Sequence, residues 1–597
     1  MMRPGLATGE VEKPQETGRV ARRLVGELAP FRPQLLGILA LIVLGAAANA
    51  AGPWLVGRAI DTNIVTGRGD GLTQTMLALL AVYVMGALTQ REQIFRIGAV
   101  GQRVLAGLRA RIFDRLLHLP LGYFDRRPVG DLMSRVINDV DTINQLVSQG
   151  LSQLLGGLFS LIGIVIIMLA LNVQMALVSF TIIPVMVLVT AFFADRSRRA
   201  SRLTRKTVGD VTAELQEEIT GIREAQAFNR TGANIARFRA RNAANRTANV
   251  QAVQITSAFS PTIDVLSTLA TAIVIGYGSY LVFNGSLTVG LLAAYLIYVQ
   301  QFFRPIQLIA QVYTQMQSAL AGGERIYGIL DEEPEPADPP GTPDLGTIRG
   351  EITFERVRFG YEAGRDVLHD VDLQIAAGQT VALVGQTGAG KTTIANLIPR
   401  FYDVTAGAVR LDGRDVREVT RASVRRQIAT VLQEPFLFSG TVAENIGYGR
   451  EGATRDEIEA AARAVDAHGF IAELAQGYDT RIGQGGGTSL SQGQRQLVSF
   501  ARAVLANPRI LILDEATSNI DTRTEAIIQK ALQTLLRGRT SVVIAHRLST
   551  IRNADLICVV DAGRIAERGT HDELIALPGG KYAALYARQF NEPTAAA

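Results

Sequence analysis

The 597-residue sequence is poor in several residue types: it has one cysteine, one tryptophan and five histidines, and only 19% of its residues are charged. Because Cys558 stands alone, an intrachain disulfide framework is excluded. The formal charge of +5 is small for so long a chain and does not indicate a nucleic-acid-binding protein. The first thirty residues are polar and charged and lack the apolar core of a secretory signal. We therefore expect the N-terminus to stay in the cytoplasm.

Hydrophobic residues, in contrast, make up 48% of the chain, which is high for a soluble enzyme and indicates membrane segments. The length suits two to four domains. Uncharged runs cover 33–57, 71–90, 142–194 and 265–303. A membrane span needs about 20 mostly apolar residues, so the first two runs hold one span each. The last two are long enough for two spans each, with polar breaks at 172–174 and 284–286, and the sequence predicts six transmembrane helices.

The two long connectors between spans fix the expected orientation. Residues 91–141 and 195–246 are rich in arginine, whereas the other loops are short and carry little positive charge. The positive-inside rule places both connectors in the cytoplasm. Their helical apolar spacing predicts that spans two to five continue as helices beyond the bilayer. We expect a multi-pass protein of the cytoplasmic (inner) membrane with both termini in the cytoplasm.

Two charged residues flank the last pair of spans. Asp264 precedes and Arg304 follows the turn at 284–286, so antiparallel helices would bring them to a similar depth. They are either interfacial charges that reach into water or members of a polar cavity between spans five and six. The sequence leaves both interpretations open.

The second half begins after an acidic, proline-rich linker at 331–350, where short strands and helices replace the long apolar runs. The segment TVALVGQTGAGKTTIANLI matches G-x-x-x-x-G-K-[ST] between a strand and a helix. In this motif backbone N–H groups close around phosphates, the lysine reaches the terminal phosphates and the hydroxyl after it can hold Mg²⁺. The predicted nucleotide ligands are Gly385, Gly388, Gly390, Lys391, Thr392 and Thr393, with Thr392 also at the metal.

The segment RILILDEATSNID places two acids side by side at the end of an apolar strand. An isolated pair of this kind is usually a helix cap beside a solvated carboxylate. In a protein with a phosphate-binding loop, however, such a strand supplies the second magnesium position. Asp514 would hold the ion through water, and Glu515 would polarise the attacking water as general base.

From about residue 30 to its C-terminus the sequence resembles a bacterial ABC exporter half-transporter. The resemblance implies an α-helical membrane domain of six transmembrane helices with long cytoplasmic extensions. It also implies an α/β P-loop NTPase domain with the helical subdomain of ABC proteins. The implied boundaries are a cytoplasmic tail at 1–30, the membrane domain at 31–330, the linker at 331–350 and the nucleotide-binding domain at 351–597.

Ordered motifs carry this resemblance and imply further site residues. FGYEAGRDVLHDVDL places Tyr361 where the family stacks an aromatic ring on adenine. VLQEPFLFSGTVAENI places Gln433 at the loop that senses Mg²⁺. VIAHRLST places His546 at the switch that contacts the γ-phosphate, and SNID places Asp521 at a loop between paired sites. In the membrane half, the resemblance implies short docking helices near 121–130 and 211–221.

The family signature implies a partner chain, because it completes the ATP site of a second ABC half-transporter. In LSQGQRQL the matching residues are Ser491, Gly493 and Gln494, whereas a glutamine replaces a usual glycine. The departures from the family pattern are Gln492, Gln484, Asn519 and Ile520. They resemble those of the intact subunit of heterodimeric multidrug-type exporters, whose partner has a weakened acidic position. A heterodimer is favoured, and a homodimer with neutral drift stays open.

These features together predict ATP-driven export of an apolar or amphipathic substrate, drug-like or lipid, by alternating access. The cofactors would be ATP and Mg²⁺, and the partners would include membrane lipid but no nucleic acid. One alternative is a homodimeric lipid flippase or specific-solute exporter with the same motor. Another is a non-transporting assembly such as an ATP-gated channel, which intact Glu515 and His546 disfavour.

Overall fold

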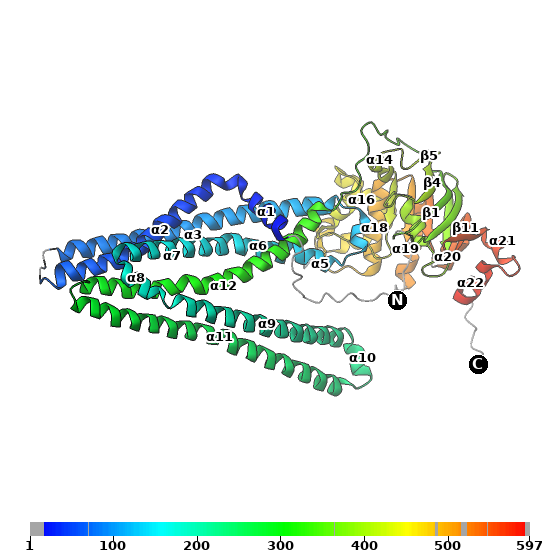
Figure 1. Cartoon of the computed structure of the whole chain (residues 1–597). Coiled ribbons are helices and arrows are strands. Elements are labelled where there is room, and N and C mark those ends of the chain that lie inside the picture. The colour runs from blue at the N-terminus through cyan, green and yellow to red at the C-terminus, as the bar shows by residue number, and fades with distance from the viewer. Residues whose placement is uncertain are drawn as a thin grey trace. The chain divides into compact units, whose positions relative to one another are not determined.

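The computed structural model describes residues 17–67, 69, 71–362, 364–483, 488–514, 522–545 and 547–590, which form two compact units (Figure 1). The helical unit comprises the described residues up to Leu119 together with Arg127–Glu333. The α/β unit comprises Pro120–Arg126 together with the described residues from Pro334 onward. A short segment of the first connector therefore belongs to the same unit as the C-terminal half.

The helical unit is built from long helices joined by short turns. Its α-helices are α1 (Thr17–Glu27), α2 (Arg32–Ala59), α3 (Leu72–Leu117), α5 (Val129–Ser134), α6 (Val140–Gln145), α7 (Leu151–Leu171), α8 (Val173–Phe180), α9 (Ile183–Thr220), α10 (Ile222–Ala227), α11 (Thr231–Phe283) and α12 (Val289–Asp331). Single π-helical turns continue them at η2 (Ile60–Ile64), η3 (Arg135–Asp139) and η4 (Leu146–Gly150). Five helical stretches among the described residues are long and apolar enough to cross a membrane. The sixth predicted span falls on α12, which carries a shorter apolar stretch at Val289–Phe303.

Both predicted polar breaks are turns between consecutive helices. Asn172 separates α7 from α8, and its side-chain oxygen accepts a hydrogen bond from the Met175 backbone N–H at 3.0 Å. This bond satisfies one of the free donors at the start of α8. The second break joins α11 to α12, and Gly285 takes φ of +70° there. A left-handed backbone of this kind suits glycine, which lacks the Cβ atom that would clash.

The prediction of a short helix at 211–221 is wrong in position. Helix α9 continues to Thr220, and the short helix is α10, Ile222–Ala227. Residues 211–220 contain no glycine or proline, so nothing in the sequence interrupts the helix before Gly221. Helices α9, α10 and α11 form a long hairpin with α10 at its tip (Figure 1). The long helices α3, α9 and α11 confirm that the spans extend well beyond the length of a bilayer.

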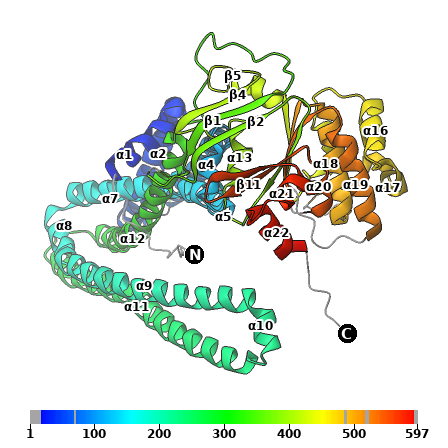
Figure 2. The same ribbon diagram turned by 90° about the vertical axis from the view of Figure 1, so that its right-hand side faces the viewer.

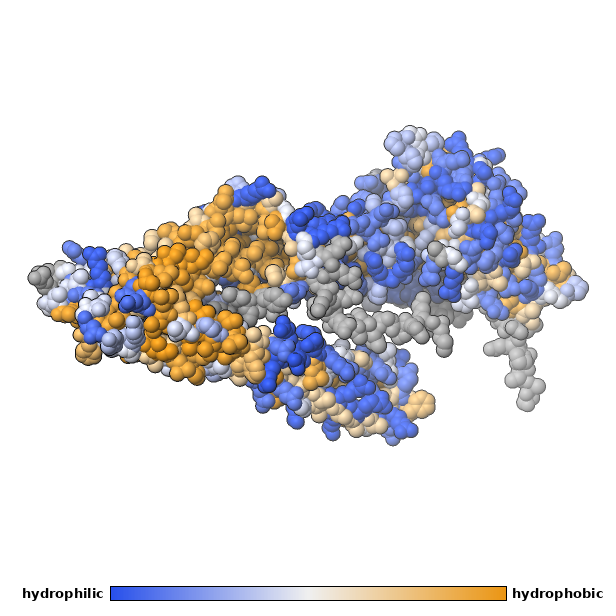
Figure 3. Space-filling model, viewed as in Figure 1, coloured by the Kyte–Doolittle hydropathy of each residue, from blue (hydrophilic) through white to orange (hydrophobic). Residues whose placement is uncertain are grey.

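The surface of the helical unit matches a protein that faces lipid. Large apolar side chains of α2, α3, α7 and α9 are exposed, among them Leu80, Leu88, Ile166 and Leu188. Figure 3 shows a broad apolar surface over the membrane-spanning part of the helical unit, whereas the α9–α11 hairpin toward its tip carries a mixture of hydrophilic and apolar residues. A second set of apolar residues is buried between α7, α8, α11 and α12. The helices therefore pack on one another through one side and expose the other side, as membrane helices do.

The α/β unit is organised around a six-stranded sheet with the order β12-β11-β3-β10-β9-β6. Strands β11, β3, β10, β9 and β6 are parallel, and β12 is antiparallel to β11. The strands are β3 (Thr380–Val384), β6 (Ile428–Val431), β9 (Ile510–Asp514), β10 (Thr540–Ile544), β11 (Leu556–Asp561) and β12 (Arg564–Gly569). The inner strands β3, β9 and β10 are rich in Val, Ile and Leu and buried on both faces, as parallel strands covered by helices are.

Two smaller sheets and a set of helices complete this unit (Figure 2). The antiparallel sheet β2-β1-β4-β5 contains β1 (Ile352–Phe359), β2 (Leu368–Ile375), β4 (Ala406–Leu411) and β5 (Arg414–Asp415), and β7 (Gly440–Thr441) pairs with β8 (Arg481–Ile482). The helices are α4 (Leu121–Asp125), α13 (Lys391–Leu397), α14 (Arg421–Arg426), α15 (Val442–Gly447), α16 (Arg455–Ala464), α17 (His468–Glu473), α18 (Gln492–Ala506), α19 (Thr522–Leu536), α20 (Leu548–Arg552), α21 (His571–Ile575) and α22 (Lys581–Phe590). Helices α15 to α18 form a helical layer, and the predicted fold class is confirmed.

Candidate functional site

Three groups of predicted site residues lie at the ends of parallel strands of the large sheet. The phosphate-binding loop follows β3, Asp514 ends β9, and Gln433 comes two residues after β6. Strand β10 lies between β3 and β9, with Ile544 in register with both Leu383 and Asp514. Parallel strands end at one edge of a sheet, and in open α/β sheets ligands bind at that edge. The fold therefore brings residues that are far apart in sequence to one place.

The phosphate-binding loop is shaped by its glycines and filled by its lysine. Gly388 and Gly390 take φ of +84° and +110°, and a Cβ on Gly390 would lie 2.8 Å from the Leu368 side chain. The Lys391 ammonium donates to the backbone oxygens of Gly385 at 2.8 Å and Gln386 at 2.9 Å. Only 7% of Lys391 is exposed. A buried cation held by neutral carbonyls, inside a loop of backbone N–H groups, fits a polyphosphate.

Burial also alters the titration of this lysine. Desolvation lowers the pKa of Lys391, and the negative charge of Asp514 acts in the opposite direction. The acid at the end of β9 is therefore close enough to influence the ammonium electrostatically. An anionic ligand in the loop would act in the same direction as Asp514 and favour the charged lysine.

The two threonines after Lys391 have different surroundings. Thr392 is exposed and free to reach a ligand, whereas Thr393 is buried. The hydroxyl groups of Thr393 and Tyr361 lie 3.1 Å apart and form a hydrogen bond. Tyr361 is 41% exposed, which leaves part of its ring open to a ligand. The structure thus brings Tyr361 to the first turn of the helix that follows the phosphate-binding loop.

The acidic side of the site is only partly within the described residues. Asp514 is half-buried at the end of β9, and Gln433 is exposed. A magnesium ion at this edge would be held by Thr392, Gln433 and Asp514 together with phosphate oxygens, which is the sparse protein coordination that Mg²⁺ prefers. Glu515, Asp521 and His546 lie outside the described residues, as do Gln484, Asn519 and Ile520.

The residues that match the family signature lie together at the start of α18. The Ser491 hydroxyl accepts from the Gln494 N–H at 3.2 Å, and the Gln494 side chain accepts from the Ser491 N–H at 2.9 Å. This reciprocal pair is a capping box that fixes the beginning of the helix. A Cβ on Gly493 would lie 2.3 Å from the Thr524 side chain of α19. Gly493 is therefore required by the packing of two helices within the unit.

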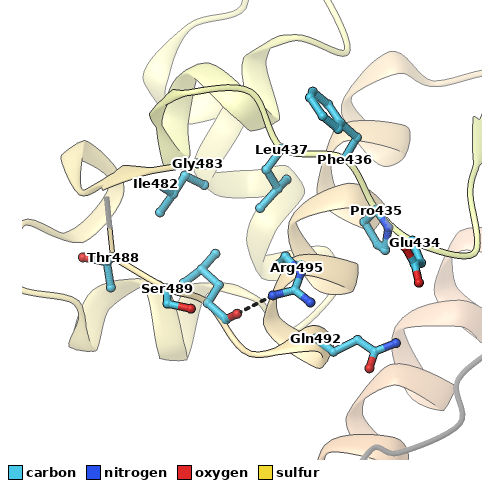
Figure 4. A pocket seen from close by; sticks show the side chains of 11 residues that line it. Glu434, Pro435, Phe436, Leu437, Ile482, Gly483, Thr488, Ser489, Gln492 and Arg495 are labelled. Atoms are coloured by element: carbon cyan, nitrogen blue, oxygen red, sulfur yellow. Dashed lines mark hydrogen bonds between the residues drawn. The ribbon is translucent and has the colours of Figure 1, made fainter. Parts of the chain in front are cut away.

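A cavity of about 510 Å³ lies beside the start of α18. Gln492 and Arg495 line it from the helix, and residues 434–437 line it from the segment after β6 (Figure 4). The Arg495 guanidinium donates to the Leu490 backbone oxygen at 2.7 Å. Gln492, one of the departures from the family pattern, thus lines a cavity next to the loop of Gln433.

One contact that sequence reasoning missed connects the site to the first connector. The Tyr402 hydroxyl donates to the Asp125 carboxylate of α4. The Tyr402 ring also packs edge-on against the Tyr361 ring, with centroids 5.1 Å apart. Burial, followed by the hydrogen bond to Asp125, raises the pKa of Tyr402. Because residues 125 and 402 are far apart in sequence, no local pattern could have predicted this pair.

Two family models match the chain. One, described as "ABC transporter transmembrane region", matches residues 35–306, and the other, described as "ABC transporter", matches residues 368–518. The two matches coincide with the two halves of different character in the sequence.

Relatives match along nearly the whole chain. It is 40% identical to the uncharacterized ABC transporter ATP-binding protein YknV of Bacillus subtilis, over 97% of this chain and 96% of the relative. It is 38% identical to an ATP-dependent lipid A-core flippase of Syntrophus aciditrophicus, over 96% and 95% of the two chains. A solved structure of a bacterial Atm1-family ABC exporter with ATP bound superimposes with a TM-score of 0.76 and 31% identity, over 95% of this chain and 99% of that one.

Proposed function

The chain belongs to the ABC transporter family as an exporter half-transporter, and from this premise we propose that it exports an apolar or amphipathic substrate out of the cytoplasm. ATP hydrolysis coupled to transport is the activity of this family. The observation that carries the proposal is the union, in one chain, of a lipid-facing helical unit and a phosphate-binding loop beside Asp514. Lipid is the favoured substrate class, because one relative is named as a lipid A-core flippase.

Each site residue has a proposed role that its position supports. Lys391 binds the terminal phosphates, and Tyr361 stacks on the base. Asp514, Thr392 and Gln433 hold Mg²⁺, which ATP brings with its phosphates. Glu515 accepts a proton from the attacking water, and His546 contacts the γ-phosphate. In the sequence, Glu515 is the next residue after β9 and His546 comes two residues after β10. ATP supplies the phosphoanhydride bond whose hydrolysis drives the cycle.

The proposed assembly is a dimer in which Ser491, Gly493 and Gln494 complete the ATP site of the partner. A heterodimer is our preferred form, because Gln492 replaces the usual glycine on the surface offered to the partner's site. A homodimer is the alternative, and it is supported by the intact phosphate-binding loop and Asp514, which give this chain a competent site of its own. We place the dimer in the cytoplasmic membrane with both termini inside, because both long connectors are rich in arginine.

The experiment that tests the assembly is steady-state ATP hydrolysis by the purified chain, with native mass spectrometry of the same sample. A stable dimer whose activity is lost in Glu515→Gln would establish a homodimer. An inactive monomer that regains activity with a second half-transporter from the same cells would establish a heterodimer. ATP hydrolysis without any ATP-driven uptake into inverted vesicles would support the non-transporting alternative.

A further inference from the structure

A cavity of about 540 Å³ opens inside the helical unit, among α2, α3, α7, α12 and the η4 turn. Its lining includes Gln90 and Gln93 of α3, Gln153 of α7 and Gln301 of α12. Gln90 ends an uncharged run, and Gln93 lies just inside the arginine-rich connector. The cavity is therefore at the end of the spans that faces the cytoplasm.

The chemistry of this lining is unusual for a membrane bundle. Half of the lining residues carry an amide or a hydroxyl group, and none of the described lining side chains is charged. On α7 and the preceding turn, the polar and small residues recur every four positions, at 148, 152, 156 and 160 and at 149, 153 and 157. This spacing places them on one side of a helix. Four glycines in the lining leave room beside these polar groups.

One polar group of the lining has no partner among the described residues. The side-chain oxygen of Gln153 is buried and accepts no hydrogen bond there. Its neighbour Ser152, in contrast, accepts a hydrogen bond from the Gln93 amide at 2.6 Å. A buried acceptor without a donor costs free energy, so native proteins rarely keep one unless a ligand or water satisfies it. Gln153 lines the cavity, so a turn of its side chain would present this oxygen, which surrounding atoms cover, to a ligand.

The charged residues considered for this region do not contribute to the described lining. Asp264 is exposed on α11 and is not among the lining residues. The Arg304 side chain is outside the described residues, although its neighbour Pro305 lines the cavity. An ionised group in a membrane interior requires a partner of opposite charge, whereas amides and hydroxyls satisfy neutral polar groups. The described lining thus selects for a headgroup with many hydrogen-bonding groups and no charge.

We propose that this cavity binds the uncharged, hydroxyl-rich headgroup of a lipid, such as a sugar on a diacylglycerol. The inference rests on the proposed export function and specifies its substrate. Gln153, Gln93 and Gln301 contact the headgroup hydroxyls, because an amide can both donate to and accept from them. The apolar residues of the lining, Ile42, Ile94 and Leu308, contact the beginning of the acyl chains. The headgroup enters from the cytoplasmic leaflet, where the cavity lies.

The test is lipid retention by the full-length protein in phosphatidylcholine nanodiscs, read by native mass spectrometry without ATP. The probes share two oleoyl chains and differ in headgroup: a neutral disaccharide, anionic phosphoglycerol, a cationic trimethylammonium group, or a bare glycerol hydroxyl. We expect the disaccharide lipid to be retained at least about five-fold more than each of the others, since each hydrogen bond gained is worth about that factor. Equal retention of all four lipids, or preference for the anionic lipid, would overturn the proposal. Preference for the anionic lipid would indicate that Arg304 binds the headgroup.

Substitutions then locate the site. Gln153→Met keeps the volume and removes the amide, and we expect it to lower disaccharide-lipid retention about five-fold. Gln153→Glu keeps the shape and adds a charge, which should shift retention from the neutral to the cationic lipid. The matched control is Gln145→Met, because Gln145 is exposed on α6 and does not line the cavity. Unchanged lipid selectivity in both Gln153 variants would contradict the site.

Two further outcomes separate this inference from the proposed function. Selective binding without ATP-driven movement of the same lipid would overturn the export function and leave the cavity assignment intact. Transport of lipids without headgroup preference would overturn the cavity assignment and leave the export function intact. Free disaccharide that displaces the lipid at equal concentration would show that a soluble sugar, and not a lipid, is the ligand.

Discussion

At the scale of single residues, Lys391 shows how a buried cation is satisfied within the phosphate-binding loop. Its ammonium is buried and satisfied by two backbone oxygens of its own loop, at 2.8 and 2.9 Å. These bonds fix the ammonium within the loop. The same arrangement makes the lysine costly to keep charged without a ligand, which is why burial lowers its pKa.

We predict that Lys391→Met lowers the rate of ATP hydrolysis by at least about a hundredfold, because a positioned charge on the transferred phosphate is lost. The measurement is steady-state phosphate release by the reconstituted protein. Lys530→Met is the matched control, since Lys530 is exposed and pairs with Asp466 at the surface. Near-normal hydrolysis by Lys391→Met would contradict the assignment of the phosphate site.

Cys558 provides a second prediction at this scale, concerning pH. The thiol is fully buried on β11, and burial raises the pKa of Cys558 from 9.0 to about 12. The pKa of the Cys558 thiol is higher in the folded protein than in the unfolded chain. The stability that the buried, protonated thiol contributes is therefore complete below pH 9. It falls by about 1.4 kcal/mol per pH unit as the pH rises from 9 towards 12. We expect the stability advantage over Cys558→Ala to shrink over that range, measured by denaturant unfolding of both proteins.

The same thiol can report on unfolding. We expect maleimide to label the native protein hardly at all at pH 7.5 and to label it fully in denaturant, because Cys558 is both inaccessible and protonated. Rapid labelling under native conditions would show that β11 is not buried as described.

At the scale of secondary-structure elements, α2 and α12 meet through glycine. A Cβ on Gly290 would lie 2.0 Å from the Gly57 backbone oxygen, so the two helices touch backbone to backbone. Asp61 reinforces this contact, because its carboxylate accepts from the Gly290 N–H at 2.7 Å and from the Thr288 hydroxyl at 2.5 Å. Small residues allow this close approach between membrane helices.

We predict that Gly290→Ala destabilises the helical unit by roughly 1–3 kcal/mol, because the added methyl group forces the helices apart. Thermal unfolding in detergent, followed by circular dichroism, measures this loss. Gly276→Ala is the control, because nothing lies within 4 Å of a Cβ at that position of α11. Equal unfolding temperatures for the two variants would contradict the close contact.

The α4 helix is attached to the α/β unit through Tyr402, which also contacts Tyr361. We predict that Tyr402→Phe leaves ATP hydrolysis within about two-fold of wild type, because the ring contacts with Phe359 and Tyr361 remain. Loss of the hydrogen bond to Asp125, worth about 1 kcal/mol, should lower the amount of substrate moved per ATP. Parallel assays of hydrolysis and transport measure this ratio. An unchanged ratio would show that Tyr402 holds α4 in place without a part in coupling.

The elements themselves could largely be predicted from the sequence. The uncharged runs predicted the membrane spans, and the polar breaks at Asn172 and Asn284 predicted the turns between them. Both predictions succeed because each pattern depends on residues close together in the sequence. The position of α10 could not be predicted from family resemblance, since Gly221 alone ends α9 in this chain. The recurrence of polar residues every four positions on α7 was visible in the sequence. The cavity itself could not be predicted from this recurrence, because it forms only when α2, α3 and α12 pack around α7.

At the scale of the whole molecule, the chain combines a membrane-embedded unit and a nucleotide-binding unit in one transport activity. Asp514 and the phosphate-binding loop lie at one sheet edge in the α/β unit, and the helical unit presents an apolar surface to lipid. The site residues Glu515 and His546 were predicted from motifs and lie outside the described residues.

The most direct measurement is ATP-driven lipid translocation in proteoliposomes, with the chain purified together with any partner that accompanies it. A fluorescent diacylglycerol bearing a neutral disaccharide is added to the leaflet that faces the ATP sites, and its protection from dithionite is followed. We expect protection that requires ATP and disappears in Glu515→Gln. Protection that proceeds without ATP, or at an unchanged rate in Glu515→Gln, would contradict the proposed function.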